Sequence, residues 1–140
     1  GVDADTAEIR LRRMLGVFSI GRVFNAKTAR SQLIGGMTFG VGSALLEEAV
    51  VDTRTGAFVN HDLAGYLVPV HADIPEIDAV LLDGFDGKAN VLGAKGAGEL
   101  GNCGANAAVA NAVFNATGVR VRDFPITLDK LLPGMPLQEI

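Results

Sequence analysis

The chain has 140 residues, a length typical of one domain with a substantial core, and we expect residues 1–140 to form a single domain. The formal net charge is −4, and the basic cluster of Arg10, Arg12 and Arg13 lies on a predicted strand, which argues against nucleic-acid binding. A single cysteine excludes an internal disulfide and a multi-cysteine metal site, and no apolar run approaches the ~18 residues of a membrane span.

The composition is more apolar than that of most free-standing domains. Hydrophobic residues make up 49% of the chain and charged residues 20%, whereas charged residues usually make up about 25%. We therefore expect other protein to cover part of the surface. Gly1 is not a natural initiator, and a strand pattern begins within a few residues of it, so we also expect this chain to be a piece of a longer one.

The first half of the chain predicts strands, a long helix and a hairpin. Alternating apolar residues predict two short strands, or a hairpin, within 7–24. Residues 27–49 predict a helix with an apolar stripe along one face. A further hairpin is predicted over 49–59, with its turn at 53–56.

The second half predicts a strand over 77–82 and then the clearest helical periodicity of the chain, over 103–117. Asn102 is the predicted N-cap of that helix, and Gly118 is suited to the position just after its last turn.

The last predicted elements are short. Residues 119–121 predict a strand, and 128–132 predict a helix that Thr127 caps and Pro133 ends. Because strands and helices do not alternate regularly, the expected class is α+β, with two layers of strands and helices.

The helix predicted over 27–49 contains four glycines, each of which costs roughly 1 kcal/mol relative to alanine inside a helix. Gly36, Gly40 and Ala44 are spaced by four residues and form a smooth ridge. This ridge predicts tight packing against another backbone or contact with a flat ligand, and the two interpretations are compatible.

Residues 93–101 read Gly-Ala-Lys-Gly-Ala-Gly-Glu-Leu-Gly and carry one carboxylate, Glu99, on nearly bare backbone. Glycine lets the main chain approach a ligand closely. A lone acid in this setting, shortly before a predicted helix, is placed like a catalytic base beside a bulky cofactor. The alternative is a flexible surface loop in which Glu99 and Lys95 are merely solvated.

The same segment also matches the dinucleotide-binding pattern G-x-G-x-x-G through Gly96, Gly98 and Gly101. Three observations weigh against that interpretation. Glu99 would repel a pyrophosphate, residues 88–93 are a poor strand, and too few residues follow Asp123 to complete a doubly wound sheet. A dinucleotide-binding module nevertheless stays an alternative, as does a non-catalytic domain that serves as a subunit contact.

Other chemistry-bearing residues have ordinary explanations. His61 and His71 lack further ligands at a spacing that a metal requires, so we interpret them as surface or hydrogen-bonded histidines. Cys103 stands at the start of the predicted helix, and we interpret it as a small buried residue.

Taken in order, several segments resemble the C-terminal part of the molybdopterin-binding subunit of the xanthine dehydrogenase/aldehyde oxidase family, in its bacterial form. The resemblance covers nearly the whole chain. It rests on Ile20-Gly-Arg-Val-Phe-Asn25, Gln32-Leu-Ile-Gly-Gly36, Gly40-Val-Gly-Ser-Ala-Leu-Leu-Glu-Glu48, Ala72-Asp-Ile-Pro-Glu-Ile77, Gly93-Ala-Lys-Gly-Ala-Gly-Glu99, Ala110-Asn-Ala-Val-Phe-Asn-Ala-Thr-Gly-Val-Arg120 and Pro125-Ile-Thr127.

The resemblance implies a molybdenum-dependent oxidoreductase that acts on aldehydes or N-heterocycles. It implies a molybdopterin, as such or as the cytosine dinucleotide, which holds the metal through its dithiolene, so no side chain of this chain is an expected metal ligand. Glu99 matches the family's general base, which acts on the metal-bound hydroxyl. Gln32 matches a glutamine that contacts the pterin, and the adjacent cofactor-binding residues would be Lys95, Gly96, Ala97 and Gly98.

The resemblance also implies partners. These are the remainder of the large subunit, iron–sulfur clusters and FAD on partner domains or subunits, and a small-molecule substrate, without nucleic acid or membrane. The implied location is the cytoplasm, or the periplasm after export with a partner subunit. We expect the isolated 140-residue chain to be inactive.

Overall fold

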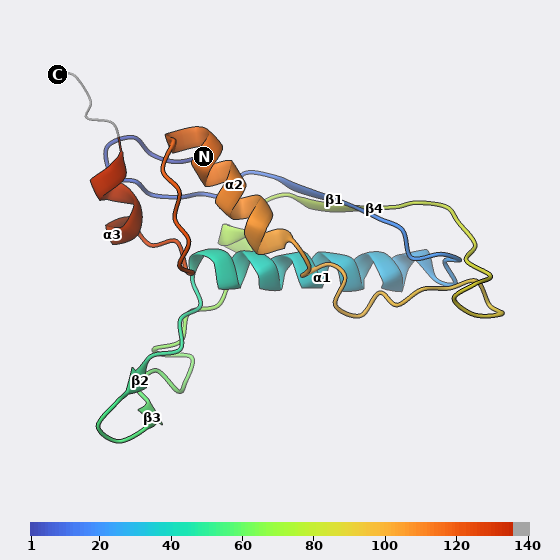
Figure 1. The fold of residues 1–140 in the computed structure, drawn as a ribbon, viewed down its shortest axis with the longest axis horizontal. Coiled ribbons are helices and arrows are strands. Elements are labelled where there is room, and N and C mark those ends of the chain that lie inside the picture. Colours follow the sequence, from blue (N-terminus) through green and yellow to red (C-terminus); the bar gives the residue numbers. More distant parts are fainter. Residues whose placement is uncertain (136–140) are drawn as a thin grey trace.

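The computed structural model describes residues 1–135 and has the mixed α+β architecture that the sequence predicts. Two short 3₁₀ turns, His71–Asp73 and Leu132–Gly134, accompany the main elements. In chain order (Figure 1), these elements are β1 (Met14–Phe18), α1 (Ala26–Leu45), β2 (Val51–Asp52), β3 (Ala57–Phe58), β4 (Ile77–Leu81), α2 (Ala105–Thr117) and α3 (Leu128–Leu131).

The pairing of β1 corrects the hairpin predicted within 7–24. β1 pairs in parallel with β4, with Met14 opposite Ile77 and Phe18 opposite Leu81. Parallel strands need a long crossover connection, which α1 begins and the β2–β3 hairpin extends. The alternation of apolar residues within 7–24 carries no information about a partner strand about sixty residues away. The local pattern therefore suggested a hairpin instead.

The helix α1 is capped by Asn25, whose side-chain oxygen accepts a hydrogen bond from the Thr28 backbone N–H at 3.1 Å. It ends four residues earlier than the 27–49 pattern predicts. The Gly42 carbonyl accepts from the backbone N–H groups of both Leu46 and Glu47, at 2.8 and 2.9 Å, which closes the last turn.

The glycine ridge of α1 serves helix packing. A Cβ added at Gly36 would lie 2.8 Å from the Asn102 nitrogen and 2.9 Å from the Gly101 Cα. A Cβ added at Gly40 would collide with the Cβ of Ala105, at the start of α2. Both glycines therefore allow the residues that lead into α2 to pack closely against α1. Ala44, the third member of the ridge, is fully buried in the core.

The termini of α2 agree only in part with the prediction. The helix is capped by Gly104 in the left-handed conformation, at φ +84°, and not by Asn102. Gly118 ends it at φ +75°, as predicted. Asn102 was the better cap by side-chain chemistry, but its backbone packs against Gly36 three residues before the helix begins.

The chain after α2 corrects the strand predicted over 119–121. Arg120 folds back onto α2, with its guanidinium 4.0 Å from the Phe114 ring centre and one nitrogen 2.9 Å from the Asn111 side-chain oxygen. No strand forms there. The short helix α3 forms where predicted. Thr127 occupies its cap position without a side-chain capping hydrogen bond.

The β2–β3 hairpin forms where predicted and projects from the body of the molecule (Figure 1). Val51 pairs with Phe58 in antiparallel fashion, and the Gly56 N–H donates to the Asp52 carbonyl at 2.7 Å to close the turn.

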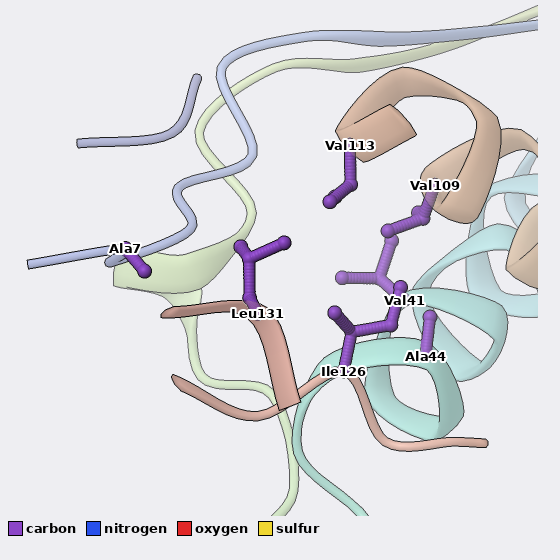
Figure 2. Packing of buried hydrophobic residues seen from close by; sticks show 7 residues of the cluster. All are labelled: Ala7, Val41, Ala44, Val109, Val113, Ile126 and Leu131. Atoms are coloured by element: carbon purple, nitrogen blue, oxygen red, sulfur yellow. The ribbon is translucent and has the colours of Figure 1, made fainter. Parts of the chain in front are cut away.

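Two buried clusters hold the layers together, and α1 contributes to both. Leu33 and Met37 pack against Ala79 of β4, so α1 covers one face of the β1/β4 sheet. Val41 and Ala44, near the other end of α1, belong to the larger cluster (Figure 2). Its members are Ala7, Val41, Ala44, Val109, Val113, Ile126 and Leu131.

Adjacent glycines of α1 provide a matched test of this packing. Gly36→Ala should lower the free energy of unfolding by about 1–3 kcal/mol, because its methyl group meets backbone that cannot easily move. Gly35→Ala, which meets nothing within 4 Å, should raise it by about 0.5–1 kcal/mol. Urea unfolding of the two variants measures both changes, and equal effects would contradict the ridge assignment.

Candidate active site

Three segments converge at the end of the molecule where α1 begins. They are the stretch after β1, the stretch after β4 and the lead into α2 (Figure 1). The first two are joined by backbone hydrogen bonds: Lys95 donates to Ile20 and Arg22 donates to Gly93, each at 2.8 Å. Gly21 permits this contact, since it has φ +68° and a Cβ there would collide with the Gly93 carbonyl.

The structure brings Gln32 to the glycine segment. It lies on α1, and its side-chain nitrogen Nε2 donates to the Gly98 carbonyl at 2.6 Å across 66 positions of sequence. The amide has two N–H donors and one carbonyl acceptor. One donor is used by Gly98, so one donor and the acceptor oxygen stay available to a ligand.

Lys95 anchors the other end of the segment. Its ammonium nitrogen donates to the Ser19 hydroxyl at 2.8 Å. Lys95 is exposed, and among residues 1–135 it forms no salt bridge with Glu99. These two charges therefore do not pair within the described part of the chain.

Glu99 lies in an exposed turn, not at the start of the helix. Its backbone carbonyl accepts from Asn102 at 3.0 Å and Cys103 at 3.3 Å. The helix α2 starts only at Ala105. Because the helix dipole acts within about the first turn, α2 stabilises the Glu99 charge less than the sequence suggested. Across residues 1–135 the carboxylate has no hydrogen-bond partner, and it is open to solvent.

The glycines of residues 93–101 fall into two groups. A Cβ at Gly93 would collide with the Phe85 ring, and a Cβ at Gly101 would collide with the Leu33 carbonyl. Beside Gly96 and Gly98, in contrast, an added Cβ meets nothing within 4 Å. Gly101 is required by packing against backbone and Gly93 by its φ of +71°, whereas Gly96 and Gly98 have no packing role among residues 1–135.

The backbone between these two anchors presents hydrogen-bond donors. Within residues 1–135, the N–H groups of Gly96, Ala97 and Gly98 donate to no protein acceptor. Successive N–H groups on bare backbone suit the oxygen atoms of an anionic or strongly polar ligand. This donor set and the open space beside it fit a bulky cofactor.

Two further residues support the segment and were missed by sequence reasoning. The Asn90 side chain donates to the Ala94 carbonyl at 2.7 Å and accepts from the Leu92 backbone at 3.0 Å. Asparagine before a glycine turn is a recognisable signal for such bonds. Ser19, the partner of Lys95, gives no signal in the sequence.

The dinucleotide alternative lacks its structural context. Residues 88–93 form turns and irregular backbone where the pattern requires a strand, and no strand follows α2 up to residue 135.

The remaining candidates contribute no second site. Within residues 1–135, no group of three or more His, Cys, Asp or Glu side chains is suited to hold a metal ion. Cys103 is exposed, which corrects the expectation that it is buried. A hollow of about 410 Å³ on the hairpin side is lined by His61, Phe58, Leu63 and Tyr66 among others, and by none of the site residues. None of the helices described is long and apolar enough to cross a membrane.

Comparisons with known proteins give consistent matches. Residues 1–75 match the family described as the molybdopterin cofactor-binding domain. The chain is 62% identical over 136 residues to PaoC of Escherichia coli, the molybdenum-binding subunit of an aldehyde oxidoreductase, which covers 97% of this chain and 19% of that protein. It is 32% identical over 130 residues to the xanthine dehydrogenase molybdenum-binding subunit of Escherichia coli, covering 93% of this chain and 17% of that protein.

A solved structure has the same fold. The aldehyde oxidoreductase from Desulfovibrio desulfuricans superposes on 96% of this chain with a TM-score of 0.84 and 31% sequence identity. The match covers 14% of that longer chain. This chain thus spans less than a fifth of the length of each of these relatives.

The contact between Gln32 and Gly98 can be tested without any ligand. Gln32→Ala removes the side-chain donor that holds Gly98, so the amides of Asn102 and Cys103, which donate to the neighbouring Glu99 carbonyl, should exchange with deuterium several-fold faster. Lys27→Ala, an exposed change earlier on α1, is the matched control and should leave the exchange of these two amides unchanged. Unchanged exchange in the Gln32 variant would show that this contact does not hold the segment.

Proposed function

Since this chain belongs to the family of molybdopterin cofactor-binding domains, we propose that it forms the C-terminal part of the molybdopterin-binding subunit of a molybdenum-dependent oxidoreductase. The relatives named as molybdenum-binding subunits support this proposal, and each is several times longer than this chain. The site at the start of α1 would then be one wall of a cofactor site that the rest of the subunit completes.

Three parts of this wall would hold the cofactor. The N–H groups of Gly96, Ala97 and Gly98 would donate to its polar atoms, because they have no acceptor within the described residues. Gln32 would contribute its second N–H and its carbonyl oxygen. Lys95 would add a positive charge beside the loop. When bound, the cofactor supplies the molybdenum centre that takes up the electrons removed from the substrate.

Glu99 is the proposed general base. Its carboxylate is exposed, directly follows Gly98 and has no hydrogen-bond partner among residues 1–135, so it is free to accept a proton at one of its oxygens. The Gln32–Gly98 bond would fix the backbone that carries it. The proposal rests on one observation: the Glu99 carboxylate, which has no hydrogen-bond partner among residues 1–135, lies next to a loop whose backbone N–H groups have no acceptor there.

We propose aldehydes as the substrate class in preference to N-heterocycles. The relative with 62% identity is named as part of an aldehyde oxidoreductase, whereas the one named as part of a xanthine dehydrogenase has 32% identity. Comparing turnover of aromatic and aliphatic aldehydes with that of purines by the purified complex tests this preference, and faster turnover of purines would contradict it.

We also propose that the electrons leave through iron–sulfur clusters and FAD on partner subunits, since these relatives are named as subunits of larger enzymes. Iron, sulfide and flavin analysis of the purified complex tests this assignment. The cofactor form, whether plain molybdopterin or its cytosine dinucleotide, and the location in cytoplasm or periplasm stay predictions from the sequence resemblance.

Replacement of the proposed base gives a direct test in the full-length enzyme. Glu99→Gln keeps the shape of the side chain and removes its basicity, so turnover should fall about 10²–10⁴-fold while molybdenum content and melting temperature stay unchanged. Glu48→Gln, at another exposed glutamate, is the control and should leave turnover unchanged. Near-normal turnover of the Glu99 variant would exclude Glu99 as the base, and loss of molybdenum would assign it to cofactor binding instead.

The isolated 140-residue chain should contain no molybdenum and show no aldehyde oxidation, because it provides only one wall of the proposed site. Metal analysis and a dye-reduction assay on the purified chain check this outcome. Stoichiometric molybdenum together with turnover would show that the chain is sufficient by itself.

A further inference from the structure

Within residues 1–135, the sheet formed by β1 and β4 is covered on one face only. Ala79 is buried beneath α1, and Phe18, Ile77 and Leu81 pack around it on the same side. The alternate side chains point the other way. They form what we call the outer face: Leu15, Val17, Val80 and Leu82, which are 50%, 56%, 42% and 46% exposed.

The sequence of both strands is that of a sheet buried on two sides. β1 reads Met-Leu-Gly-Val-Phe, and β4 with the following residue reads Ile-Asp-Ala-Val-Leu-Leu. Strands of parallel sheets read as nearly continuous apolar runs because helices cover both faces, whereas a sheet with one solvated face shows polar residues at alternate positions. The outer face therefore has the composition of an internal surface.

Asp78, the charged residue within β4 that alternates onto the same side as the outer face, does not oppose burial. Asp78 accepts from the Arg30 guanidinium at 2.6 Å, and this hydrogen bond holds the pKa of the Asp78 carboxyl below its usual range. The carboxylate therefore already has a cationic partner when another layer approaches.

The edges of this sheet are also open. Among residues 1–135 the sheet has two strands, so each strand has one unpaired edge. A two-stranded parallel sheet with an exposed apolar face is not stable by itself. In known folds, further strands extend such a sheet, and the helices that connect these strands cover its face.

We propose that the outer face is an internal packing surface, covered by α-helices from the part of the longer subunit that lies outside this chain. The proposal rests on the proposed function, which places this chain within such a subunit. The relative with 62% identity has over four-fifths of its length outside the match, which is ample for further strands and crossover helices. A second copy of this chain would bring sheet against sheet, an arrangement that parallel sheets rarely adopt.

Hydroxyl-radical footprinting of the full-length subunit, read by mass spectrometry, tests the proposal without any substitution. Each side chain of the outer face is compared in native and urea-unfolded protein. Coverage should slow the modification of all four by more than about tenfold, as for fully buried side chains. With the exposed fractions that the four side chains have in this chain alone, their modification would slow only about twofold. Met37, which is 3% exposed beneath the sheet, controls for native folding.

The outcomes separate this inference from the proposed function. Twofold slowing in a subunit that contains molybdenum would overturn the covered face and leave the function intact. Strong protection in a subunit without molybdenum would keep the covered face and count against the function. Protection that disappears when the subunit is diluted to a monomer would assign the face to a second copy and overturn the proposal.

Discussion

The structure depends on the close approach between α1 and the segment that leads into α2. Gly36 and Gly101 let backbone pack directly on backbone, and Gly40 leaves room for the Cβ of Ala105. One turn before Gly36, α1 carries Gln32, which holds Gly98 three residues before Gly101. The contact between α1 and the segment leading into α2 thus joins the core to the candidate site. The packing that buries Leu33 also places residues 96–98 at the start of α1.

This contact explains which parts of the fold the sequence could predict. Helices with strong periodicity, the β2–β3 hairpin and the final short helix follow from local patterns, and each forms close to the predicted residues. The pairing of β1 with β4 and the absence of a strand at 119–121 depend on distant partners. At Asn102 the local preference and the tertiary packing differ. Its side chain suits a helix cap, but its backbone packs against Gly36.

The candidate site shows the same division. Glycine spacing and the lone Glu99 identify the segment from sequence, and the resemblance supplies Gln32, which the structure places against it. The bond between Lys95 and Ser19 spans 76 positions and could not be read from either neighbourhood. Glu99 was expected shortly before the helix predicted over 103–117, but residues 100–104 form a turn between Glu99 and α2, and turn length is poorly specified by composition.

The two groups of glycines in residues 93–101 have different consequences for how the protein can change. Gly93 is required by its left-handed φ of +71°, and Gly101 by its contact with the Leu33 backbone. Among residues 1–135, Gly96 and Gly98 have no such internal requirement. In the proposed cofactor wall, protein abundance would respond to changes at the first pair and ligand affinity to changes at the second, so that folding and recognition can drift or be engineered independently within nine residues.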